Sequence, residues 1–226
     1  MFLEFKALAG VQSFSFGKQE CTLLKLEKTF NLQQVRNLPA LQEWLSAIAD
    51  ISEREKTNLL DLREILIDNV DDWNEQELAL HFIGPLFAFV NFSSKRFNAF
   101  AERMLSGIVE GVEMSGQPDG MIASGRREPE IPYFCFQEYK KEKDAQGDPA
   151  AQALAAMLVA QTLNNGNNPI YGCYVRGRNW FFMILQDKTF YISQNYSSTK
   201  DEIFDIFRIL KVLKQKIIEI TDINED

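Results

Sequence analysis

The segments Gln117-Pro118-Asp119-Gly120 and Phe136-Gln137-Glu138-Tyr139-Lys140 decide how this chain is organised. Asp119 is flanked by proline and glycine, which is typical of a turn that leads into a strand. Glu138 and Lys140 stand two residues apart on an otherwise apolar strand, so their side chains share one face. Such a strand is usually buried on both faces, and a buried charge needs a partner or a metal ion. The two segments therefore predict a polar site at one edge of a sheet.

A helix is expected soon after this strand. Asp148 is a favourable N-cap residue, Pro149 takes the first helical position, and the Ala-rich run that follows carries Gln152. The apolar segment 170–175 then predicts another strand. Strand, helix and strand in this order predict a crossover connection within one sheet.

The order and spacing of Pro118-Asp119 and Glu138-Tyr139-Lys140 resemble the PD-(D/E)XK nuclease superfamily, which is restriction-endonuclease-like. Gln152 on the following helix resembles the motif order of the RecB-like members. The resemblance implies an α/β (α+β) fold, with a mixed central sheet flanked by helices, over residues 73–226. Residues 1–72 carry no such match and are expected to form a small, mainly helical unit.

The mechanism that the resemblance implies is metal-assisted hydrolysis of phosphodiester bonds. Asp119 and Glu138 would ligate Mg²⁺ or Mn²⁺ through oxygen, and the main-chain carbonyl of Tyr139 would be a further ligand. The cation would polarise a phosphoryl oxygen and lower the pKa of a bound water. Lys140 would orient that water. Gln152 would hydrogen-bond near the scissile phosphate or hold Lys140 in place.

A further acidic ligand is expected from Glu77, which precedes Gly84-Pro85-Leu86 on a helix that starts near Asn74. This helix resembles the first helix of restriction-type relatives, and the resemblance implies that Glu77 completes the metal site directly or through water. A glutamate in a first helical turn is also an ordinary complement to the helix dipole. Glu110 and Glu113, on a preceding strand, are alternatives for the acidic role.

The function expected from the resemblance is that of a metal-dependent nuclease in restriction, repair or defence. One alternative is a catalytically inactive module of the same fold that binds nucleic acid or protein. Another is a structural scaffold assembled through residues 1–72. The complete set of Asp119, Glu138 and Lys140 favours the nuclease.

The charge of the chain bears on its partners. A net charge of −8 and a pI near 4.9 oppose binding to free nucleic acid, because phosphate neutralisation supplies most non-specific affinity. Basic clusters in residues 126–127, 140–143 and 176–178 would line one groove on an acidic body. The expected partners are nucleic acid, DNA rather than RNA, and a protein that compensates for the acidity. The sequence leaves open whether the chain forms a homodimer. Members of the superfamily that cut both strands often dimerise.

Other chemistries and compartments find little support. His81 is the only histidine, which excludes a histidine-rich metal centre, and its place on a largely apolar helix favours a packing role over that of a base in a Ser-His-Asp triad. Three scattered cysteines indicate free thiols in a reducing compartment. No signal peptide is recognisable, and the longest apolar run, residues 153–160, is too short to span a bilayer. We expect a cytoplasmic protein that does not enter a membrane.

The remaining elements are expected from periodicity and capping. Residues 1–30 alternate weakly and are interpreted as short strands, whereas residues 97–103 are interpreted as a short helix or loop. Ser52, with Glu55 three residues later, has the capping-box pattern. Further helices are expected to begin at residues 38–39, 52 and 202, and further strands to cover 105–114, 120–124, 180–185 and 189–193.

Overall fold

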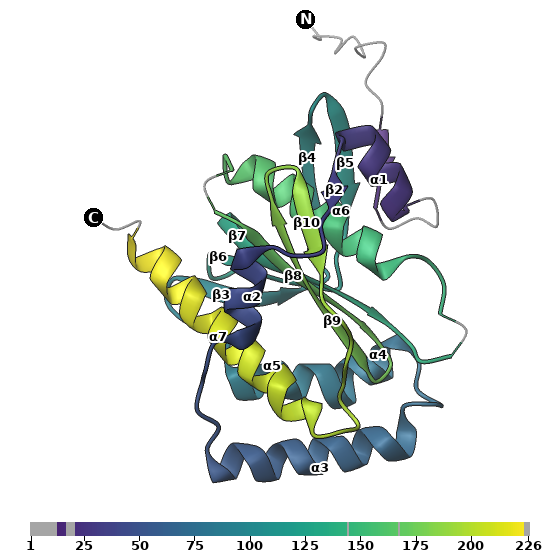
Figure 1. The fold of residues 1–226 in the computed structure, drawn as a ribbon, viewed down its shortest axis with the longest axis vertical. Coiled ribbons are helices and arrows are strands. Elements are labelled where there is room, and N and C mark those ends of the chain that lie inside the picture. Colours follow the sequence, from purple (N-terminus) through teal and green to yellow (C-terminus); the bar gives the residue numbers. More distant parts are fainter. Residues whose placement is uncertain (1–12, 17–20, 144, 167, 224–226) are drawn as a thin grey trace, which may run out of the picture.

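A computed structural model describes residues 13–16, 21–143, 145–166 and 168–223. In it, helices cover both faces of a mixed sheet, so the predicted mixed α/β fold is confirmed (Figure 1). The sheet has eight strands, with the order β2-β10-β9-β8-β7-β6-β3 and with β11 paired to β9. The strands are β2 (Gln33–Gln34), β3 (Phe97–Ala101), β6 (Gly120–Ser124), β7 (Glu130–Lys140), β8 (Ile170–Arg176), β9 (Asn179–Gln186), β10 (Thr189–Ile192) and β11 (Tyr196–Ser197).

The centre of the sheet is built from β7, α6 (Pro149–Leu163) and β8. The strands β7 and β8 are parallel, as a crossover through a helix requires, and this confirms the predicted strand, helix and strand. Asp148 caps α6 by accepting the N–H of Ala151, and it also accepts the N–H of Leu23. The helix packs closely on the sheet, because a side chain at Gly172 would meet the sulfur of Met157.

A second, three-stranded sheet lies on the same side of the central sheet as α6. It has the order β1-β5-β4, made of β1 (Ser13–Ser15), β4 (Leu105–Val109) and β5 (Val112–Gly116). Helix α1 (Leu23–Phe30) packs beside it, capped by Thr22, so the expectation of strands throughout residues 1–30 was wrong for this segment. Leu26 and Phe30 are the buried residues of α1, and they have helical spacing. Apolar residues also precede them, so the segment resembled the alternating pattern of a strand. Residues 1–12 lie outside the described residues.

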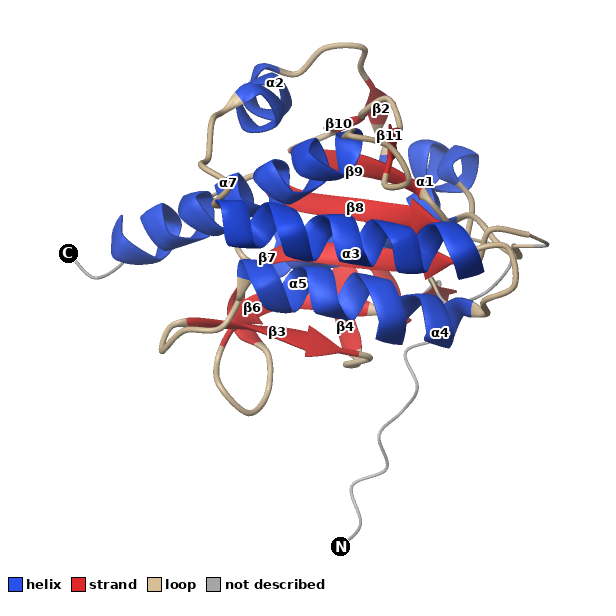
Figure 2. Ribbon diagram, turned by 90° about the horizontal axis from the view of Figure 1, so that it is seen from below, coloured by secondary structure: helices blue, strands red, loops and turns tan. Residues whose placement is uncertain are grey.

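The other face of the central sheet is covered by α2 (Pro39–Ser46), α3 (Glu53–Asn69), α5 (Gly84–Val90) and α7 (Glu202–Ile223). Figure 2 shows α3, α5 and α7 lying across it. The predicted capping box of Ser52 and Glu55 is present at the start of α3. Trp44 of α2 is fully buried and donates its indole N–H to the carbonyl of Ile209 on α7 at 2.9 Å. The helices before residue 72 thus share the core of the sheet. Whether residues 73–226 fold without them stays a prediction.

One helix changes its winding in the middle. It runs as α4 (Glu75–Leu78), continues as the π-helix η1 (Ala79–Ile83) and ends as α5. Pro85 has no N–H and cannot make the usual helical hydrogen bond to the carbonyl four positions earlier. The N–H of Gly84 donates to the carbonyl of Ala79, five positions earlier, which is the π-helical bond. A side chain at Gly84 would approach that carbonyl to 3.0 Å. The expected helix from Asn74 is therefore present, with a wider turn at its centre.

Two segments differ from expectation. Residues 97–101 form the edge strand β3, antiparallel to β6, and not a helix or loop. Ala99 and Ala101 of this strand are exposed, so the segment lacks the apolar alternation of a buried strand. The expected strand 105–114 is a hairpin of β4 and β5 that belongs to the smaller sheet.

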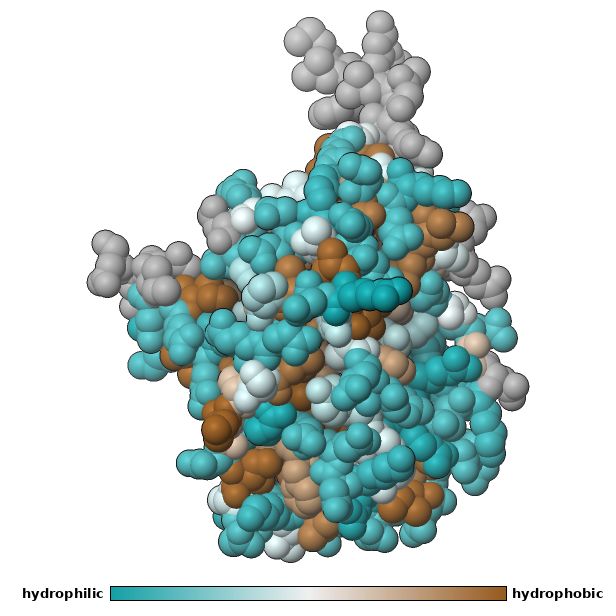
Figure 3. Space-filling model, viewed as in Figure 1, coloured by the Kyte–Doolittle hydropathy of each residue, from teal (hydrophilic) through white to brown (hydrophobic). Residues whose placement is uncertain are grey.

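The surface seen in Figure 3 is largely hydrophilic, with hydrophobic residues scattered between polar ones. Among the described helices, none combines the length and the apolar character that a membrane crossing needs.

Candidate functional site

Sheet register brings the two motif segments together. Strands β6 and β7 are antiparallel, and Gly120 at the start of β6 pairs with Gln137 near the end of β7. The residue before Gly120 therefore faces the residue after Gln137, which sets Asp119 opposite Glu138. Lys140 ends β7, beside Arg176 of β8. The structure thus gathers Asp119, Glu138 and Lys140 at one end of the central strands.

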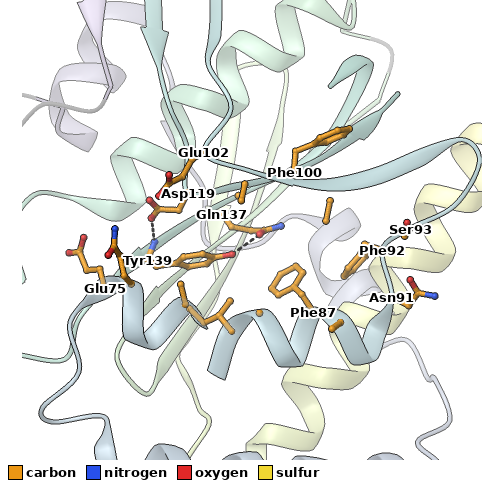
Figure 4. A pocket seen from close by; sticks show the side chains of 18 residues that line it. Glu75, Phe87, Asn91, Phe92, Ser93, Phe100, Glu102, Asp119, Gln137 and Tyr139 are labelled. Carbon is orange, nitrogen blue, oxygen red and sulfur yellow. Dashed lines mark hydrogen bonds between the residues drawn. The ribbon is translucent and has the colours of Figure 1, made fainter. Parts of the chain in front are cut away.

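Asp119 is held by the main chain of its neighbour. Its Oδ2 accepts a hydrogen bond of 2.6 Å from the main-chain N–H of Tyr139 (Figure 4). Continuing the register places Pro118 opposite Tyr139, and proline has no N–H for the ladder. The carbonyl of Tyr139 points to the same edge as its N–H, so it faces Asp119 with no donor from residue 118. This geometry leaves that carbonyl available as a metal ligand.

The two carboxylates lie in a poorly solvated site. Glu138 is 3% exposed, and burial first, then the charge of Asp119, raises its pKa well above the ordinary value. Burial also raises the pKa of Asp119, although the N–H of Tyr139 and the charge of Lys140 act in the opposite direction. Two like charges pressed together favour a proton or a cation between them.

Lys140 is 8% exposed and projects from the same face of β7 as Glu138, the face that α6 covers. Its Nζ lies 3.8 Å from Oε2 of Glu75, at the start of α4. Glu75 also raises the pKa of both Asp119 and Glu138, although less than burial does. An ammonium group between carboxylates at a strand end is well placed to orient a water or a phosphate oxygen.

The acidic residue that the first helical turn brings to the site is Glu75, and Glu77 has a different task. The carboxylate of Glu77 accepts the N–H of Asn74 at 2.8 Å and completes a capping box. Asparagine followed three residues later by glutamate is the sequence signal for that box, and it would have separated the two glutamates. Glu110 pairs with Lys188, and Glu113 is exposed on β5, so neither is placed among the motif carboxylates.

Gln152 lies near the start of α6, on the side of the sheet from which Glu138 projects. Its Oε1 is buried and has no hydrogen-bond partner among the described residues. A side chain at Gly147 would come within 3.4 Å of this oxygen. No hydrogen bond joins Gln152 to Lys140 among the described residues, so the role expected for Gln152 stays a prediction.

The donor set at this end of the sheet suits a hard divalent cation only in part. Within the described ranges, no group of three or more His, Cys, Asp or Glu side chains is arranged to hold a metal ion. Asp119, Glu138 and the carbonyl of Tyr139 nevertheless offer oxygen ligands only. Mg²⁺ is commonly held by one or two carboxylates, with water and substrate phosphate in its remaining positions. The pKa of both carboxylates is raised because their negative charges are poorly solvated and lie close together, and a bound cation would compensate those charges.

A pocket of about 570 Å³ opens beside the carboxylates, on the opposite face of the sheet (Figure 4). Asp119 and Tyr139 line both the pocket and the motif site. Gln137 forms part of its wall, 3% exposed, and its Oε1 accepts the hydroxyl of Tyr139 at 2.7 Å. A side chain at Gly120 would come within 2.3 Å of that oxygen, so this arrangement requires glycine. Sequence reasoning did not identify Gln137, because its role depends on this packing.

Three residues of the basic clusters expected to line a groove, Lys140, Lys143 and Arg178, are paired with acids. Arg178 donates to Asp71 at 2.7 Å and contacts Glu142, and Lys143 lies 3.9 Å from Asp71. These pairs reduce the positive charge that is available to a polyanion near the site. The three cysteines are free and buried, and the ring of His81 lies against that of Trp73 in a tilted arrangement.

Comparison with known proteins adds no family to this description. No family model matches the chain, and no curated protein matches it significantly.

Proposed function

We propose that the chain is a metal-dependent nuclease that hydrolyses phosphodiester bonds with Mg²⁺ or Mn²⁺. The observation that carries the proposal is the meeting of Asp119 and Glu138, beside Lys140, at the shared end of β6 and β7. Glu138 is buried and Asp119 is partly buried, and both have a raised pKa, which is the usual condition of a functional pair and is rare for charges that serve only solubility.

The position of each residue assigns it a separate role in the proposed reaction. Asp119, Glu138 and the carbonyl of Tyr139 would hold the cation. When bound, a divalent cation supplies polarisation of the phosphoryl group and a lowered pKa for water. The ammonium of Lys140 orients the attacking water and stabilises charge that develops on the phosphate oxygens. Glu75, 3.8 Å from that ammonium, keeps Lys140 directed toward the carboxylates.

The proposed substrate is nucleic acid, with DNA favoured over RNA. The net charge of −8 and the acid pairs of Arg178 and Lys143 reduce the positive charge that can bind a long polyanion. We therefore infer that a partner protein, or a second copy of this chain, supplies part of the affinity. Three buried free thiols support a reducing compartment, and we propose the cytoplasm.

A second candidate is an inactive module of the same fold that binds nucleic acid or protein. It is favoured by one observation: in the described part of the chain, no third acidic or histidine side chain is arranged with Asp119 and Glu138 to hold a metal ion. Such a module would bind its partner equally well after either carboxylate is neutralised.

Cleavage of labelled single- and double-stranded DNA and RNA, in Mg²⁺ and in Mn²⁺, tests the proposal. Glu138→Gln and Lys140→Met should each abolish cleavage, whereas the matched variant Glu113→Gln, on an exposed strand position, should cleave normally. Circular dichroism would show that all three proteins are folded. Cleavage that survives both of the first two substitutions would rule out the proposed site.

A further inference from the structure

The motif carboxylates continue across the sheet into an aromatic pair. Strand register sets Glu138 opposite Tyr174 of β8, and Tyr174 opposite Phe181 of β9. Register partners project from the same face of a sheet, so all three side chains lie on the face on which α6 packs. Neighbouring strands are about 4.8 Å apart, which places Phe181 about 10 Å from Glu138 across the sheet.

Helix α6 covers the next row inward and leaves the aromatic pair partly exposed. In that inner row Gly172 and Met183 are buried, and Met157 of α6 lies over Gly172. Tyr174 and Phe181 are only partly buried, and their rings are stacked, with centroids 4.5 Å apart and planes 10° from parallel. Tyr174 thus takes one face of the Phe181 ring, and no second ring of the described residues lies against the other face.

Positive charge lies next to this row, at the end of the strands. Lys140 and Arg176 are register partners on β7 and β8, and alternation along each strand puts them on the same face as Glu138 and Tyr174. Arg176 is exposed, and no salt bridge joins it to an acid of the described residues. Its guanidinium is therefore available to an anion that reaches Lys140.

The acid at the start of α6 is already engaged. Asp148 lies close enough to Tyr174 that burial first, and then this charge, raises the pKa of the phenol to about 12. Its two carboxylate oxygens accept the main-chain N–H groups of Leu23 and Ala151, in the first turns of α1 and α6. Two helix N-termini thus compensate its negative charge on this face.

We propose that one strand of nucleic acid crosses the sheet from Glu138 toward Phe181, with a base stacked on Phe181 and a backbone phosphate at Arg176. The inference rests on the proposed nuclease function and names its substrate class, single-stranded or locally unpaired nucleic acid. Exposed aromatic rings bind unpaired bases by stacking, with little regard to sequence, and basic side chains beside them follow the phosphates.

A duplex fits this surface less well than a single strand. Bases inside a duplex are stacked on one another, so none offers a free face to Phe181 without unstacking, which costs free energy. The phosphates of a duplex would still reach Arg176. The aromatic ring therefore supplies the preference for single strands, and the guanidinium supplies affinity that depends on salt.

Binding of a labelled oligothymidylate of about ten nucleotides, followed by fluorescence anisotropy without divalent metal, tests the surface. The wild type should bind it saturably. Phe181→Leu keeps an apolar side chain and removes the ring, so binding should weaken by about tenfold with an unchanged salt dependence. Arg176→Met removes one charge and should lower the slope of log affinity against log salt concentration by about 0.7.

The matched controls are Arg127→Met, exposed in the turn before β7, and Phe89→Leu, exposed on α5 across the sheet. Both should bind as the wild type does, and circular dichroism would show that every variant is folded. An abasic oligonucleotide of the same length keeps the phosphates and lacks the bases. The wild type should bind it about tenfold more weakly, and Phe181→Leu should not weaken it further. This comparison tests stacking in the unaltered protein.

Cleavage separates this inference from the function on which it rests. In Mg²⁺ the wild type should cut single-stranded DNA faster than duplex, and Phe181→Leu should reduce that preference. Binding that depends on Phe181 and Arg176, without any cleavage, would overturn the nuclease and leave the binding surface. Absence of saturable binding, equal binding of the abasic oligonucleotide, or wild-type binding by either variant would overturn the surface, and cleavage that persists would then leave the nuclease.

Discussion

The main-chain N–H of Tyr139 donates a hydrogen bond of 2.6 Å to Oδ2 of Asp119. It couples the start of β6 to the end of β7 at the point where Pro118 cannot continue the ladder. A carboxylate thus replaces a main-chain acceptor, and the strand end becomes a place where two acids meet. The same bond fixes the carboxylate against the carbonyl edge of Tyr139.

Two substitutions of Asp119 should separate its contribution to stability from its contribution to cleavage. Asp119→Asn keeps an oxygen for the N–H of Tyr139, whereas Asp119→Ala leaves that N–H without its acceptor. We expect both variants to lose cleavage by at least about a hundredfold, because each lacks a charged ligand. Only Asp119→Ala should also lose about 1–3 kcal/mol of stability in urea unfolding. Equal stability of the two variants would contradict a stabilising role for the hydrogen bond between Tyr139 and Asp119.

The two glutamates of the first turn of α4 form a natural pair for comparison. Glu75→Ala removes the partner of Lys140 and should reduce cleavage while leaving the unfolding midpoint nearly unchanged, since Glu75 is partly exposed. Glu77→Ala removes half of a capping box and should lower stability by about 0.3–1.5 kcal/mol, with cleavage retained. The reverse pattern, with cleavage lost in Glu77→Ala only, would return the metal role to Glu77.

Stability should depend on pH through Glu138. Burial and Asp119 raise its pKa above the ordinary value of 4.5, so the folded state retains a proton that the unfolded state has lost. Stability therefore falls as pH rises from about 4.5 to the raised pKa, by about 1.4 kcal/mol for each pH unit in that window.

The matched variant for this effect is Glu138→Gln, which cannot titrate at this position. Thermal unfolding of the two proteins over a pH series measures the difference, and Mg²⁺ should remove the wild-type loss at high pH by binding the folded state. Parallel pH profiles without metal would show that Glu138 is not the buried acid described here.

The first third of the chain should be needed for folding. Leu41, Trp44, Leu59 and Leu66 are fully buried in the core that α7 and β9 share, and the indole of Trp44 bonds to Ile209. A fragment of residues 73–226 would expose this core, so we expect it to be unfolded or aggregated. Soluble fragment with native near-ultraviolet circular dichroism would establish the boundary expected at residue 72.

Local signals explain why the centre of the fold could be predicted. Asp148 and Pro149 start α6 through capping rules that need no tertiary information. The apolar run of β7 identifies a buried strand by itself. Charged residues at its end, Glu138 and Lys140, then stand out because burial makes charges rare.

Other features depend on packing that no local pattern carries. Strand β3 is an edge strand with exposed alanines, so residues 97–101 show no alternation of apolar side chains. Gln137 became a candidate only through the close approach of Gly120 and the hydroxyl of Tyr139. The capping box that engages Glu77 is visible in the sequence, so the capping rule alone distinguishes Glu77 from Glu75.

The most direct measurement of the central claim is Mn²⁺ binding by calorimetry. It compares the wild type with an Asp119→Asn, Glu138→Gln double variant, alone and with a short phosphorothioate oligonucleotide that supplies phosphate ligands. The two carboxylates predict saturable binding by the wild type in at least one condition and its loss in the variant. Failure of the wild type to bind in both conditions, or equal binding by the variant, would contradict a metal site at Asp119 and Glu138.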